Sequence, residues 1–213
     1  MLSYPKIDSL FLRDLDNNNR SFLVGKWARE EFEYLKNLPW SWTEKIDGMN
    51  IRVIWDGRQV HFRGRNDGTQ IHTRLGDHLR AKFLTSKLAE VFSEPATLYG
   101  EGYGDRIQKL GAQYLPSQEF ILFDVFCKNW LPREAVTEIA EKLDLPVVPV
   151  VGVGPLTMAI DFAAAGFFSQ VAVTPKTLAE GIVMRLPIEL QDRHGARIIT
   201  KAKFKDFLRQ KKL

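Results

Sequence analysis

Two neighbouring runs near the start of the chain, residues 49–55 and 58–65, place β-branched and aromatic residues between charged positions. Such runs are typical of strands. They are joined by Asp56-Gly57, a pair that favours a tight hairpin turn. We therefore predict a β-hairpin here, with another strand just before it at residues 42–45.

Helical periodicity is clearest at residues 75–92, where apolar side chains recur three and four positions apart. Residues 132–143 predict a second helix, with Pro132 in its first turn. Further helices are expected at 26–38, near 156–166 and at the C-terminus, and strands at 96–101, 119–127, 180–186 and 196–203. Hairpin-linked strands with interspersed helices predict an α+β protein rather than a doubly wound parallel sheet.

The composition is that of a globular protein, with 45% hydrophobic and 26% charged residues among 213. This length predicts a single domain spanning residues 1–213. A lone cysteine, Cys127, excludes an intramolecular disulfide and favours a reducing, cytoplasmic location. The most apolar stretch, residues 145–173, contains three prolines and an aspartate, so we expect no membrane segment.

Positive charge is concentrated in two segments, although the net charge of the chain is only +4. Residues 192–213 hold eight Lys or Arg against two acidic residues, and residues 52–87 hold eight against three. Clustered cations suit a polyanionic partner such as nucleic acid. On charge alone, two solvated surfaces are the better explanation of the pattern.

The segment with the most chemical interest is EKIDGMN, residues 44–50, in which Lys45 stands between a predicted strand and a tight turn. A lysine whose amine is kept neutral by burial or neighbouring cations is a nucleophile. Taken by itself, the segment also fits an exposed lysine beside a turn. No P-loop motif is present, and the histidines and Cys127 lack the spacing of a zinc site.

Four further segments follow EKIDGMN in a fixed order: LYGEGYG (98–104), FILFDVF (120–126), EGIVMR (180–185) and TKAKFK (200–205). Together the five segments resemble nucleotidyl motifs I, III, IIIa, IV and V of the covalent nucleotidyltransferases. That superfamily comprises ATP-dependent RNA and DNA ligases and mRNA-capping guanylyltransferases. Motif I ends in Asn50, where DNA ligases and capping enzymes usually have arginine, so the chain is most similar to the RNA ligase 2 type.

This resemblance implies an antiparallel-sheet, ATP-grasp-like adenylyltransferase core and three nucleotidyl transfers. Lys45 would attack the α-phosphorus of ATP, the AMP would pass to a 5′-phosphate end, and a 3′-OH would then seal the strands. Lys201 and Lys203 would face the α-phosphate and favour the neutral amine of Lys45. Glu180 would hold Mg²⁺ or Mn²⁺ or orient the lysine.

The resemblance also implies a set of ATP contacts. Glu101 would accept hydrogen bonds from the ribose, and Phe123, rather than Phe120 or Phe126, would lie against adenine. The other expected contacts are Glu44 with the base, Asn50 with the phosphates or reacting ends, and Arg63, Arg65 or both with phosphate. The expected partner is RNA, as a nicked duplex or as free ends, including RNA–DNA hybrids.

Only ten residues follow Lys203, so we expect no appended OB domain, and the basic segments would have to grip the substrate. In particular, Arg209, Lys211 and Lys212 are expected to serve substrate binding rather than lysine adenylylation. Two alternatives stay open: a DNA ligase or guanylyltransferase on the same core, and a nucleic-acid-binding module with an inactive site.

Overall fold

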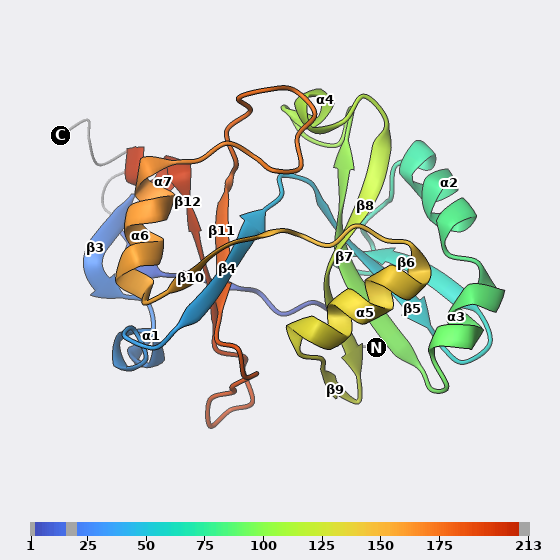
Figure 1. Ribbon diagram of the computed structural model, residues 1–213, viewed down its shortest axis with the longest axis horizontal. Helices are drawn as coiled ribbons and strands as arrows, with labels where there is room; N and C mark the ends of the chain where they lie inside the picture. The colour runs from blue at the N-terminus through green and yellow to red at the C-terminus, as the bar shows by residue number, and fades with distance from the viewer. Residues whose placement is uncertain (1–2, 16–20, 209–213) are drawn as a thin grey trace. The chain divides into compact units, whose positions relative to one another are not determined.

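The computed structural model describes residues 3–15 and 21–208, which form two compact units (Figure 1). The first unit comprises residues 3–5, Ile46–Val148 and Val171–Thr177. The second unit comprises the described residues of Lys6–Lys45, Pro149–Gln170 and 178–208. Arg209, Lys211 and Lys212, the expected substrate-binding tail, lie outside the described residues. The single domain predicted over residues 1–213 stays a prediction.

The first unit is built on a five-stranded antiparallel sheet. Its strands, in spatial order, are β6 (Val60–Gly64), β5 (Met49–Trp55), β7 (Ala96–Gly104), β8 (Gln118–Cys127) and β9 (Asn129–Trp130). The Asp56-Gly57 turn joins β5 and β6 in the predicted hairpin, and Asp56 Oδ1 accepts the backbone N–H groups of Arg58 and Gln59 at 2.8 Å.

One face of this sheet is covered by helices. Alternate residues of the strands, such as Ile51, Val53 and Leu98, are fully buried in one apolar core with side chains of the helices. The covering helices are α2 (Thr73–Lys82), α3 (Thr85–Val91) and α5 (Arg133–Leu143), which can be followed in Figure 1. The short helix α4 (Gly111–Tyr114) follows β7, and Tyr114 joins a smaller apolar cluster with Ile46, Tyr103 and Ile121.

The second unit contains another five-stranded sheet. Its order is β1 (Asp8–Ser9), β12 (Ile199–Lys203), β11 (Gly181–Arg185), β4 (Trp40–Lys45) and β10 (Val150–Gly154). All neighbours are antiparallel except β1 and β12. A hairpin and three helices complete the unit: β2 (Phe11–Arg13), β3 (Phe22–Trp27), α1 (Glu30–Tyr34), α6 (Leu156–Ala165) and α7 (Phe204–Leu208).

The α+β prediction with antiparallel sheets is confirmed, and two element predictions are corrected. The helix expected at 26–38 is only α1, because residues 22–27 pair with β2 as a strand. The helix expected at 75–92 is interrupted at Phe83, whose side chain turns into the core and separates α2 from α3. In the described part of the chain, no helix has the length and apolar character needed to cross a membrane.

Candidate functional site

Three strands of the second unit align Lys45 with Lys203. In the register of the sheet, Gly181 of β11 lies opposite Lys45 on one side and Lys203 on the other. Directly opposed residues of antiparallel strands project to the same face, so the two lysines share one face across a glycine. Lys201 lies two positions before Lys203 and faces the same way, opposite Val183.

The carboxylate of Glu180 joins the two lysines. Lys203 Nζ lies 2.5 Å from Glu180 Oε1, and Lys45 Nζ donates to Glu180 Oε2. The exposed fractions are 12% for the Glu180 side chain, 21% for Lys45 and 23% for Lys203, so the cluster is sheltered but open to a ligand. The structure thus brings Lys45, Glu180 and Lys203, all predicted as catalytic residues, into one contact network.

Gly181 allows strand β12, which carries Lys203, to lie close to Glu180. It has a φ of +155°, and an added Cβ would lie 2.1 Å from the carbonyl oxygen of Ala202 and 2.7 Å from Lys203 Cα. Both are backbone atoms, which cannot turn away as a flexible side chain can. A glycine is therefore required between Glu180 and the strand that carries Lys203.

The lysines also set the ionisation of Glu180. Burial raises the pKa of this carboxyl, but the positive charges and hydrogen bonds of Lys45 and Lys203 outweigh it and hold the pKa below its usual value of 4.5. Glu180 is therefore ionised at neutral pH. It can fix the position of both ammonium groups or offer its oxygens to a cation.

Glu44 precedes Lys45 on β4, and its side chain has a different environment. It is 1% exposed, Gln170 N donates to Oε2 at 2.8 Å, and the Ser169 hydroxyl donates to Oε1. Burial raises the pKa of Glu44, while these two donors oppose the rise. No sequence pattern predicts Ser169 or Gln170, because they belong to no motif and lie about 125 residues away along the chain.

The first unit holds the other predicted residues. Asn50 and Glu101 lie directly opposite each other on β5 and β7, on the face away from the helix-covered core. Asn50 Oδ1 is buried and has no hydrogen-bond partner among the described residues. A buried unpaired acceptor is costly, which marks this position as one that a ligand would satisfy.

Burial separates Phe120 from Phe123 and Phe126, the other two phenylalanines of FILFDVF. Phe120 is fully buried in the helix-covered core, against Phe83, whereas Phe123 is only half-buried. The Phe123 ring meets Tyr4 edge to face, with centroids 5.0 Å apart, and the Tyr4 hydroxyl donates to Asp124 Oδ2 at 2.7 Å. Tyr4, which no motif includes, therefore fixes one edge of the ring predicted to lie against adenine.

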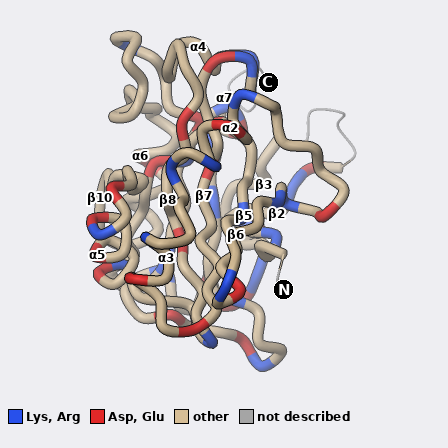
Figure 2. The backbone as a smooth tube through the Cα atoms, turned by 90° about the vertical axis from the view of Figure 1, so that its right-hand side faces the viewer, with Lys and Arg blue, Asp and Glu red and all other residues tan. Residues whose placement is uncertain are grey.

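The basic segment 52–87 is only partly available to a partner. Arg52 is 2% exposed and donates to Gly64 O and to Asp67, while Arg80 and Lys82 pair with Asp77 and Asp144. Arg63 and Arg65 are exposed, and Arg63 bonds the Phe62 carbonyl at 2.9 Å. The Lys and Arg positions can be followed along the backbone in Figure 2.

A divalent cation fits Glu180 only in company with other ligands. Among the described residues, no group of three or more His, Cys, Asp or Glu side chains is arranged to hold a metal ion. Mg²⁺ commonly takes one or two carboxylates and completes its shell with substrate phosphates and water. The ionised Glu180 carboxylate fits that pattern, so a metal here would arrive with a phosphate ligand.

A comparison with models of known protein families gives a match over most of the chain. Residues 38–203 match the model of the RNA ligase family, a range that contains every catalytic residue predicted above. The chain belongs to the RNA ligase family. A search of curated proteins found no match.

Solved structures of an RNA ligase from Naegleria gruberi share the fold. The ligase with pyrophosphate has a TM-score of 0.67 and 21% identity, over 86% of this chain and 54% of that chain. An arginine-to-alanine mutant with ATP and Mn has a TM-score of 0.70 and 18% identity, over 99% of this chain and 58% of that chain. The chain thus spans a little more than half the length of these relatives.

Proposed function

We propose that the protein is an ATP-dependent RNA ligase that joins 3′-OH and 5′-phosphate ends through a lysyl-AMP intermediate on Lys45. The observation that carries this proposal is the contact of Glu180 with both Lys45 and Lys203 across Gly181. Membership of the RNA ligase family supports RNA as the substrate class. Nicked duplexes, free RNA ends and RNA–DNA hybrids are the forms of substrate that we propose.

In the first step, the neutral Lys45 amine forms an Nζ–P bond with the α-phosphorus of ATP, and the bond from that phosphorus to pyrophosphate breaks. Nζ gives up a proton, and its contact with Glu180 Oε2 supports a route for that proton. Lys203 and Lys201 act as fixed cations for the charge that develops on the phosphate. The Naegleria ligase structures hold ATP with Mn or pyrophosphate, which are a substrate and a product of this step.

A divalent metal ion fits this proposal as a partner of Glu180. When bound, Mg²⁺ or Mn²⁺ neutralises phosphate charge. The protein contributes the ionised Glu180 carboxylate, which is held by the Lys203 ammonium group and, until its amine loses a proton, by Lys45. Each Glu180 oxygen accepts from one lysine and keeps a second lone pair, so a metal could bind Glu180 without displacing either lysine.

The adenosine contacts are proposed from residues of the first unit within an ATP-grasp-like core. Glu101 is assigned to the ribose, Phe123 to adenine, Asn50 to the phosphates or the reacting ends, and Arg63, Arg65 or both to phosphate. The half-buried Phe123 ring supports its role, and the unpaired Asn50 Oδ1, which can only accept, supports contact with a hydroxyl of a reacting end rather than with phosphate oxygen. Glu44 remains a predicted base contact, and contact with adenine would require it to exchange one of its two present donors.

The test is covalent labelling. Wild-type protein incubated with ATP labelled at the α-phosphate and a divalent metal should retain label after denaturation, and Lys45→Ala should retain none. Lys36→Ala, which removes a half-buried lysine whose Nζ lies 3.9 Å from Glu33 Oε1, is the matched control and should label normally. Labelling of Lys45→Ala, or labelling of the wild type by GTP alone, would contradict the proposal.

A further inference from the structure

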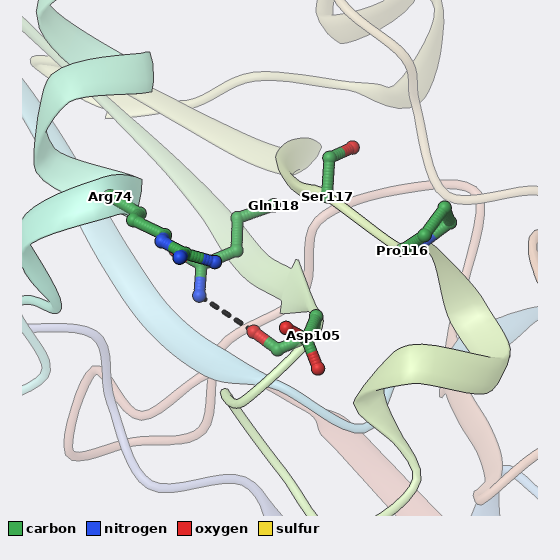
Figure 3. Close-up of a pocket in the computed structure, with 5 residues that line it drawn as sticks. All are labelled: Arg74, Asp105, Pro116, Ser117 and Gln118. Atoms are coloured by element: carbon green, nitrogen blue, oxygen red, sulfur yellow. Dashed lines mark hydrogen bonds between the residues drawn. The ribbon is translucent and has the colours of Figure 1, made fainter.

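A pocket of about 340 Å³ lies in the first unit, beyond the end of β7. It is lined by Arg74 of α2, Asp105, and Pro116, Ser117 and Gln118 at the start of β8 (Figure 3). None of these residues belongs to the predicted nucleotide contacts. Its volume is at the lower end of the range for small-molecule sites, which suits one nucleotide unit rather than a duplex.

The floor of the pocket is held by hydrogen bonds. Asp105 N donates to the carbonyl oxygens of Leu115 at 3.0 Å and Ser117 at 2.9 Å, and Gln118 Nε2 donates to Asp105 O at 2.6 Å (Figure 3). These bonds tie the loop after β7 to the start of β8. The Asp105 backbone and the Gln118 side chain are therefore held in place without a ligand.

Two of these groups lack partners in the part of the chain that the structure describes. Arg74 is exposed, and its guanidinium makes no hydrogen bond or ion pair with a described residue. Gln118 Oε1 is buried and unbonded. The first is a free cationic donor, and the second is an acceptor that gains from a donor brought by a ligand.

We infer that this pocket binds one ribonucleotide unit of the RNA strand, with its phosphate at Arg74 and its hydroxyl or amino donors at Gln118 and Asp105. Arginine suits phosphate because its donors form a planar fork. The Asp105 carboxylate is 31% exposed, and its nearest cation, Arg106 Nε, is 3.6 Å away, so it can accept a ribose 2′-OH. A 2′-OH contact distinguishes RNA from DNA.

This inference rests on the proposed function, since it names the substrate strand of a ligase, but it is tested by binding in the absence of ATP. The probes are a short labelled single-stranded RNA and a DNA of the same sequence. Arg74→Ala should weaken RNA binding roughly tenfold, as expected for loss of a charge-assisted hydrogen bond. It should also reduce the slope of log affinity against log salt by about 0.7, the share of one phosphate contact on a single strand.

Lys87→Ala is the matched control, because it removes one exposed positive charge from α3, outside the pocket. It should leave the affinity within about twofold of wild type, the range of an isolated surface charge. Asp105→Asn, which keeps the side-chain shape, should reduce the preference for RNA over DNA by about fivefold. Lysyl-AMP formation should be unchanged in all three variants.

Three results would overturn the inference: unchanged RNA binding by Arg74→Ala, an equal loss in Lys87→Ala, or loss of lysyl-AMP formation in Arg74→Ala. If the wild type forms no lysyl-AMP, the proposed function fails. The binding difference between Arg74→Ala and Lys87→Ala still decides whether the pocket takes RNA.

Discussion

Gly181→Ala is the substitution that tests the lysine–glutamate network most sharply without removing any charged group. The new Cβ would stand 2.1 Å from Ala202 O, where ordinary contacts between carbon and oxygen exceed about 3 Å, so β12 must move by about 1 Å. Lys203 lies directly opposite Gly181, so this displacement separates its ammonium group from Glu180. A misplacement of about 1 Å in an active site can cost roughly 100-fold in rate.

The assay measures the rate of lysyl-AMP formation together with unfolding in urea. We expect Gly181→Ala to lose about 1–3 kcal/mol of unfolding free energy, as overpacked sites do, and about 100-fold in rate while still folded. Gly68→Ala is the matched control, since nothing lies within 4 Å of its added Cβ. If Gly181→Ala does not fold, Lys203→Met removes the same contact without the steric change. A folded Gly181→Ala with the wild-type rate would refute the reasoning.

Three further predictions follow from the described contacts. Glu180→Gln should lower the unfolding free energy by about 2 kcal/mol at neutral pH. Because the folded pKa of Glu180 lies below 4.5, its contribution to the unfolding free energy is complete above that pH and is lost as the pH falls through the folded pKa. A difference in unfolding free energy between Glu180→Gln and the wild type that stays constant into acid would contradict this prediction. Ser169→Ala should lower the unfolding free energy by about 1 kcal/mol and raise the already elevated pKa of Glu44, because the ionised carboxylate loses a donor. The loss of unfolding free energy should shrink as the pH falls and Glu44 is protonated. A loss that urea titrations show to be independent of pH would count against this prediction. Sealing should require RNA at the 3′-OH side of a nick and tolerate DNA on the 5′-phosphate side, so equal sealing of an all-DNA nick would remove the basis for the assignment from Asn50.

The parts of the fold that local patterns determine were predicted from the sequence. The hairpin around Asp56-Gly57 follows from its turn chemistry, and α5 follows from its periodicity and from Pro132 at its start. The predictions were wrong where tertiary contacts determine the secondary structure. Phe83 ends α2 because its ring enters the core beside Phe120, and residues 22–27 become a strand because β2 lies beside them.

The candidate site shows the same division. The alternation of Lys201 and Lys203 predicts that they share a face, and the structure confirms it. The contact of Glu180 with Lys45 and Lys203 depends on how strands far apart in the sequence pair, since Lys45 and Glu180 are separated by 135 residues. No local sequence pattern contains this pairing. The support of Glu44 by Ser169, and of Phe123 by Tyr4, likewise arises only when distant segments fold together.

The most direct test of the central claim is a chase of isolated lysyl-AMP protein. Protein labelled with AMP is freed from ATP and mixed with a nicked RNA duplex that carries a 5′-phosphate, and the label is followed on protein and RNA. Our account predicts that the label leaves the protein, that a 5′-adenylylated strand forms, and that the nick is then sealed with release of AMP. Label that stays on the protein, with the nick left open, would contradict a ligase function even if Lys45 is the residue modified.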